Sequence, residues 1–115
     1  IQLGGTIRKN SVSVIGHYAE TMLESLSCNK LFIGVDGIDP DYGLTTSDLN
    51  EARINRQMIA SARNIIVLTD SSKFNRRGFC KICDIDCIHH IITDTDAPAN
   101  VIKNLQERNI KVTLV

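Results

Sequence analysis

The segment "KLFIGVDGIDPDYGLTTSDLNEARINRQMIASARNIIVLTDSSKF", residues 30–74, contains two short apolar runs rich in β-branched residues, 30–35 and 64–69. Between these runs, apolar residues recur at spacings of three and four from residue 46 to residue 63, which predicts an amphipathic helix. Two strands that are joined through a helix require a crossover connection, so we predict that they lie parallel in one sheet.

Strand and helix patterns alternate along the rest of the chain as well. Residues 90–93 and 111–115 are two more apolar runs of strand length, while residues 12–26 and 99–109 repeat the helical spacing. Residues 1–4 have the composition expected at the end of a further strand. The alternation predicts an α/β fold with a Rossmann-like, mostly parallel sheet that helices flank on both faces.

The composition is that of one ordinary globular domain. The 115 residues are 43% hydrophobic and 23% charged, and 13 basic residues balance 13 acidic ones. A neutral chain has no net field to attract nucleic acid, so any DNA contact has to come from residues outside this sequence. Neither a membrane span nor a signal peptide is present, and we expect a cytoplasmic protein without a membrane partner, whose cysteines are reduced.

Three polar loops follow predicted strands at the edge where open parallel sheets bind ligands. They are residues 35–48, 69–74 and 93–98, and each has the plain interpretation of a turn built from ordinary capping residues. We assign the third loop to that plain role. The first two loops together offer carboxylates, hydroxyls, the start of a long helix and one ammonium group.

This combination of groups suits a polyol that carries a phosphate. Carboxylates accept hydrogen bonds from sugar hydroxyls, and Asp36 and Asp39 are placed for that role. Lys73 and the N-terminus of the helix, with Thr45 and Thr46, are suited to an anionic group.

Four motifs in these segments resemble the effector-binding domain of DeoR-family transcriptional regulators, in order and in spacing. The motifs are "GGTIRKNSVSVIGHYAE", "KLFIGVDGID", "GLTTSDLNEARINRQMI" and "VLTDSSKF", and the resemblance covers essentially the whole chain. It implies a sensor for a phosphorylated sugar or related metabolite, in a repressor that contacts DNA only through a separate N-terminal winged helix-turn-helix. It also implies a homo-oligomer.

The same resemblance implies that residues 1–115 are a single sensor domain truncated at its N-terminus. The family domain normally begins with a strand and a glycine- and threonine-rich loop, and nothing in this sequence corresponds to them. A fragment without that loop is expected to bind its effector poorly.

The sensor domain is similar in turn to ribose-5-phosphate isomerase and the related CoA-transferase-like folds. Asp36, Gly37 and Asp39 match the acidic motif of the isomerases, and Ser72 and Lys73 match a later one. The position of the catalytic glutamate falls on Asn55, which cannot abstract a proton. The resemblance therefore implies a receptor with no catalytic residue and no cofactor. The alternative is an isomerase-like enzyme in which Glu51, Asp36 or Asp39 is the base.

The predicted effector-binding residues divide by role into those that contact hydroxyls, those that hold the phosphate, and one that tunes specificity. The first group is Asp36, Gly37 and Asp39; the second is Gly43, Thr45, Thr46, Ser72 and Lys73; the third is Glu51.

The segment "CKICDIDCIHH", residues 80–90, has a density of cysteine and histidine that resembles zinc or iron–sulfur ligation. Cys80, Cys83, Cys87, His89 and His90 are nevertheless crowded into a single short segment, and the adjacent histidines start a predicted strand, where they face opposite sides. In the family that the chain resembles, this segment is ordinary packing. We therefore predict no metal site.

Overall fold

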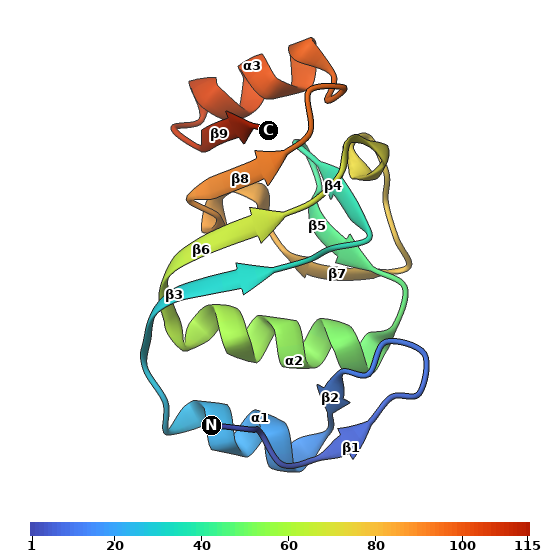
Figure 1. The fold of residues 1–115 in the computed structure, drawn as a ribbon, viewed down its shortest axis with the longest axis vertical. Helices are drawn as coiled ribbons and strands as arrows, with labels where there is room; N and C mark the ends of the chain where they lie inside the picture. The colour runs from blue at the N-terminus through green and yellow to red at the C-terminus, as the bar shows by residue number, and fades with distance from the viewer.

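The computed structural model describes residues 1–115, in which a four-stranded parallel sheet is the largest element (Figure 1). Its strands are β3 (Cys28–Ile33), β6 (Ala62–Leu68), β8 (His90–Thr93) and β9 (Lys111–Leu114), paired in that order. All three pairings are parallel. The predicted α/β class is confirmed, and each predicted strand of the sheet lies within two residues of its expected start.

Three helices accompany the sheet: α1 (His17–Glu24), α2 (Leu49–Ala60) and α3 (Ala99–Glu107). The carboxylate of Asp48 caps α2 by accepting hydrogen bonds from the backbone N–H groups of Asn50 and Glu51. Asn109, with a φ of 62°, ends the turn after α3 in the left-handed conformation that asparagine tolerates. None of the helices has the length and hydrophobicity needed to cross a membrane.

The first loop after β3 contributes two strands to a small antiparallel sheet. This sheet consists of β4 (Gly37–Asp39), β5 (Gly43–Thr46) and β7 (Cys80–Cys83), with β5 in the middle. The sequence predicted only a loop over residues 35–48 and no strand at residues 80–83. All three strands are short, and β4 and β5 contain glycines, so their apolar pattern is too weak to detect; β5 pairs with β7, which is remote in sequence.

Before α1, the chain forms a hairpin of β1 (Thr6–Ile7) and β2 (Val14–Ile15) that lies beside the N-terminal half of α2 (Figure 1). The predicted helix over residues 12–26 is therefore too long at its start, and residues 1–4 are not a strand. Two short 3-10 helices, η1 (Ser71–Lys73) and η2 (Ile85–Cys87), complete the fold.

The hydrophobic core lies on one face of the parallel sheet. Ile65, Val67 and Ile91 of the sheet pack in one cluster with Ala52 of α2 and Leu105 of α3. The four strands lie across the sheet in the order in which they occur in the chain. Right-handed crossovers between them then place every connection on the same face of the sheet.

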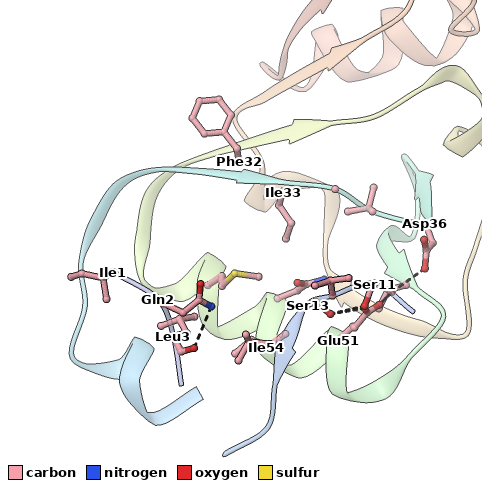
Figure 2. A pocket seen from close by; sticks show the side chains of 17 residues that line it. Ile1, Gln2, Leu3, Ser11, Ser13, Phe32, Ile33, Asp36, Glu51 and Ile54 are labelled. Carbon is pink, nitrogen blue, oxygen red and sulfur yellow. Dashed lines mark hydrogen bonds between the residues drawn. The ribbon is translucent and has the colours of Figure 1, made fainter. Parts of the chain in front are cut away.

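The opposite face of the sheet has no covering helix. Phe32 and Leu68, which alternate with the core residues along their strands, are 58% and 45% exposed. Phe32 points away from α2, while its neighbour Ile33 points toward it (Figure 2). The structure thus departs from the expected cover on both faces.

Candidate functional site

Two cavities meet at Asp36, directly after β3. The larger, of about 620 Å³, lies between β3, α2 and the N-terminal segment, and its polar lining includes Ser11, Ser13, Thr46 and Glu51 (Figure 2). The smaller, of about 250 Å³, is lined only by Asp36, Ser47, Lys73, Arg76, Arg77 and Gly78. Asp36 is the residue common to both cavities, so a ligand held at its carboxylate can extend into either one.

The carboxylate of Asp36 is ionised and keeps one oxygen available. Oδ2 accepts hydrogen bonds from the Thr46 hydroxyl at 3.0 Å and from the N–H and hydroxyl of Ser47 at 2.9 and 3.0 Å. Burial raises the pKa of Asp36, but the bonds from Ser47 and Thr46 outweigh it, and the pKa lies below its ordinary value of 3.8. No protein donor bonds Oδ1, which remains free to accept from a ligand.

Thr46 lies between two carboxylates. Its hydroxyl is 3.0 Å from Oδ2 of Asp36 and 3.2 Å from Oε2 of Glu51. A hydroxyl has one hydrogen, so Thr46 donates to only one of these carboxylates at a time. When it donates to Asp36, Oε2 of Glu51 is left without a donor beside the larger cavity, whereas Oδ2 of Asp36 keeps both Ser47 donors in either case.

Glu51, in the first turn of α2, binds mainly to the β1–β2 hairpin. Its Oε1 accepts hydrogen bonds from Ser11 at 2.9 Å and Ser13 at 3.2 Å, and it forms an ion pair with Arg8. Burial raises the pKa of Glu51, but the bonds from Ser11 and Arg8 outweigh it, and the pKa lies below its ordinary value of 4.5. Protein donors therefore occupy most of the carboxylate that the sequence assigned to specificity.

The smaller cavity is basic. Lys73 ends η1, directly beyond β6, and Arg76 and Arg77 follow it in the chain. Arg77 forms an ion pair with Asp39 at 2.7 Å, whereas Lys73 and Arg76 have no ion-pair partner. Two cations that form no ion pair line this cavity with the Asp36 carboxylate, and they suit it to a small anion.

The remaining predicted residues line neither cavity. The side chain of Asp39 is committed to Arg77 and to the N–H groups of residues 41 and 42. Gly43 is buried in β5, opposite Asp39. Ser72 bonds the Asp70 carboxylate that caps η1. Asp39 and Ser72 thus bond residues that belong to, or directly precede, the basic loop formed by residues 73–78.

Gly37 and Thr45 contact the backbone of the same loop at residues 76 and 78. The buried Thr45 hydroxyl donates to the Gly37 carbonyl at 3.3 Å and accepts from the N–H of Gly78 at 2.7 Å. A Cβ atom on Gly37 would lie 2.5 Å from the Arg76 carbonyl, so only glycine allows this approach. Their contribution to the site is structural.

Sequence reasoning missed the hydroxyls of Ser11 and Ser13, because it placed Ser13 inside a region with helical spacing, residues 12–26, and Ser11 directly before it. The alternation of Ser11 and Ser13 with Val12 and Val14 is a period-two pattern, and it is the available signal that both hydroxyls share one face. Asn55, at the position of the isomerase glutamate, lines the larger cavity. An amide cannot act as a general base, so the cavity holds ligand-binding groups without that catalytic residue.

The cysteine and histidine side chains of residues 80–90 do not surround a common point. No group of three or more His, Cys, Asp or Glu side chains is placed to hold a metal ion. Cys83 and Cys87 are paired as a disulfide, where the sequence predicted reduced thiols, and Cys80 is buried. Nδ1 of His89 accepts from the N–H of Ile65, and Nε2 of His90 bonds Thr113.

Comparison with known proteins gives the family. Residues 1–95 match the family model described as the DeoR C terminal sensor domain. All 115 residues align at 43% identity with 43% of a protein from Escherichia coli O157:H7 named as a transcriptional repressor of the aga operon. The HTH-type transcriptional regulator GlpR of Haloferax volcanii is 30% identical over 95% of this chain and 43% of its own length.

The glycerol-3-phosphate regulon repressor of Escherichia coli K12 is 27% identical over 99% of this chain and 45% of its own length. These relatives are regulators of transcription and not enzymes, and the chain spans less than half of the length of each. The chain belongs to the DeoR family of transcriptional regulators, and it forms the sensor domain of a DeoR-family repressor.

Proposed function

We propose that the protein senses a phosphorylated sugar or polyol, which it binds across the two cavities that meet at Asp36. The phosphate lies in the smaller cavity against Lys73 and Arg76. The hydroxyls of the ligand donate to Oδ1 of Asp36, and its carbon chain extends into the larger cavity. The observation that carries this proposal is that the ionised Asp36 lines both cavities, beside two cations that have no ion-pair partner.

The chemistry of the two cavities supports one ligand with two different ends. Phosphate oxygens accept hydrogen bonds and carry charge, which suits the ammonium group of Lys73 and the guanidinium group of Arg76. Sugar hydroxyls donate, which suits a carboxylate whose second oxygen has no protein partner. A neutral sugar lacks the first set of contacts, and inorganic phosphate lacks the second.

We also propose that this binding controls DNA binding elsewhere in a longer, homo-oligomeric regulator in the cytoplasm. The length of the relatives supports this, because the chain matches only 43% to 45% of three of them. A ligand that favours one arrangement of paired subunits would change the spacing of two DNA-binding domains on an operator. A gel-shift titration of the full-length regulator with phosphorylated sugars tests the coupling.

Thermal-shift measurements test the binding itself. The panel is D-glucose 6-phosphate, D-glucosamine 6-phosphate, D-sorbitol 6-phosphate, D-ribose 5-phosphate and sn-glycerol 3-phosphate, with inorganic phosphate and the unphosphorylated parents as references. A ligand that binds only the native state raises Tm in proportion to the logarithm of its concentration over Kd. At least one phosphorylated compound is expected to raise Tm more than its parent does.

Matched variants assign the effect to the site. Lys73→Ala is expected to abolish the shift, whereas Lys103→Ala, at a lysine that is 79% exposed on α3, is expected to retain it. An equal response in the two variants would contradict the proposal, as would a panel in which no phosphorylated compound raises the Tm of the native protein.

A further inference from the structure

The β1–β2 hairpin forms one wall of the larger cavity and presents two hydroxyls there (Figure 2). We propose that Ser11 and Ser13 read the hydroxyl groups of the effector, and that Glu51 is a positioning residue that fixes their orientation. This inference rests on the proposed function, because it adds specificity-determining residues to the same site.

The three side chains form a triangle in which each lies within hydrogen-bond distance of the other two. The two serine hydroxyls are 2.7 Å apart, and they lie 2.9 and 3.2 Å from Oε1 of Glu51. The triangle has three contacts but only two hydroxyl hydrogens, so both hydrogens are used within it. Ser11 also accepts from Arg8 at 3.5 Å, so the serines retain for a ligand only their remaining acceptor lone pairs.

The part of the cavity wall formed by the hairpin, Asp36 and Glu51 therefore selects for donors, while the amides of Gln2 and Asn55 line the same cavity. The serine lone pairs, Oδ1 of Asp36, and Oε2 of Glu51 when Thr46 donates to Asp36, all accept hydrogen bonds. A ligand with several hydroxyls, or with a protonated amine, donates hydrogen bonds to these acceptors. A deoxygenated analogue leaves some of the acceptors unpaired and binds more weakly. The chemical class that the hairpin favours is a densely hydroxylated or amino-substituted chain.

Glu51 links the hairpin to the rest of the site. Besides the two serines it bonds Arg8, and through Thr46 it connects to Asp36. Arg8 adds a contact of 3.7 Å to Asp48, the residue that caps α2. Because Glu51 holds both serines through one oxygen, its removal changes the orientation of both hydroxyls together.

The backbone between the two serines is in an unfavourable conformation. Val12 has a φ of 53°, in the left-handed region that β-branched residues rarely adopt. The hairpin bonds from the N–H of Arg8 to Ser13 and from the N–H of Val12 to Arg8 hold it there. Backbone strain of this kind persists where surrounding contacts over-determine it, and here those contacts aim Ser11 and Ser13 at the same carboxylate.

Isothermal titration calorimetry with named probes tests the inference. For each variant, selectivity is the Kd of inorganic phosphate divided by the Kd of D-sorbitol 6-phosphate, with D-glucose 6-phosphate and 2-deoxy-D-glucose 6-phosphate as a second pair. The double variant Ser11→Ala with Ser13→Ala is expected to lose at least tenfold in selectivity, while its Kd for inorganic phosphate changes less than twofold. Ser25→Ala with Ser27→Ala, at two exposed serines, is the matched control and is expected to keep the native selectivity.

The positioning role of Glu51 has its own readout. Glu51→Ala is expected to lose selectivity as the serine double variant does, and to cause less than a twofold further loss when combined with it. Glu51→Gln is expected to recover part of the selectivity, because its amide oxygen still accepts from both serines. If Glu51→Ala fails to fold, Glu51→Gln and the serine variants carry the test.

The two ways of failing are distinct. Native selectivity in the serine double variant, with sugar phosphates still bound, would overturn the inference and leave the proposed function intact. The absence of binding of every probe to the native protein would overturn the proposed function, and this inference with it.

Discussion

Arg8 and Glu51 form an ion pair that ties the β1–β2 hairpin to the first turn of α2. The two side chains are 25% and 17% exposed, so water competes with the pair less than it does with an ion pair on the open surface. Since the two serines bond the same carboxylate, one residue of α2 fixes a hairpin that is distant in sequence.

Replacing Glu51 by alanine should therefore destabilise the fold. The change leaves Arg8, Ser11 and Ser13 without their acceptor, and the expected loss is about 1–3 kcal/mol in the free energy of unfolding. Urea denaturation measures it as a lower midpoint with an unchanged slope. Glu107→Ala, which removes a 4.0 Å surface pair with Lys103, is the control and is expected to cost about 0.5 kcal/mol or less. Equal midpoints for the two variants would contradict the account.

Gly37→Ala should destabilise β4 more than any ordinary surface change. Its Cβ atom would lie 2.5 Å from the carbonyl oxygen of Arg76 and 2.6 Å from the Thr45 hydroxyl, so backbone has to move. Overpacking of this kind costs about 1–3 kcal/mol. Gly34→Ala is the matched control, because its Cβ atom meets nothing closer than the Leu68 carbonyl at 3.9 Å. The prediction is wrong if both glycine variants unfold at the same urea concentration.

The stability of the protein should fall as the pH is lowered, in two ranges. The pKa of His90 lies below its ordinary value of 6.5 because burial, and then the charge of Lys111, disfavours its protonated form. The unfolded chain therefore binds this proton first, and stability declines as the pH falls below 6.5. His90→Gln should flatten this upper range, which unfolding measured from pH 8 to pH 5 can detect.

The carboxylates act in the lower range. The pKa values of Asp36, Asp39 and Glu51 lie below their ordinary values of 3.8 and 4.5. Their contribution to stability is complete above those ordinary values and is lost as the pH falls through the folded pKa values. Thermal unfolding below pH 5 should show a steeper decline in the native protein than in Glu51→Gln. Parallel curves would show that Glu51 is not held in its charged form.

The cysteines should differ sharply in reactivity. Cys28 is exposed, Cys80 is buried, and Cys83 and Cys87 are paired. Iodoacetamide without reductant should modify Cys28 quickly, Cys80 only after unfolding, and the remaining two only after reduction. Peptide mass spectrometry identifies each site. Rapid modification of Cys83 and Cys87 in the native protein without reductant would show that both are thiols in solution.

The sequence predicted the parallel sheet well for a physical reason. A strand such as Ile65–Val67, buried between others, has to be apolar, and that composition is visible without knowing its partners. The small antiparallel sheet was not predicted, because Gly37 and Gly43 are required by contacts with residues 76 and 83 that no local pattern shows. The convergence of Asp36 and Lys73 was predicted, since the carboxyl ends of parallel strands lie at one edge.

The roles of single polar residues were harder to predict than their location. Thr45 and Thr46 are adjacent, yet one supports the Gly78 loop and the other lies between two carboxylates. The partners of both hydroxyls include residues far away in sequence, so composition and spacing do not distinguish them. Ser11 and Ser13 were missed because the local spacing indicated a helix and their partner Glu51 is distant in sequence.

The most direct test of a single site at Asp36 and Lys73 is a titration of the 15N-labelled protein, followed by its amide NMR shifts. The ligand is the panel compound that raises Tm most. Amides at Asp36 and Ser47, and those at Lys73 and Gly78, should shift together and fit one Kd. Shifts confined to one of the two loops, or two loops that fit different Kd values, would contradict the account.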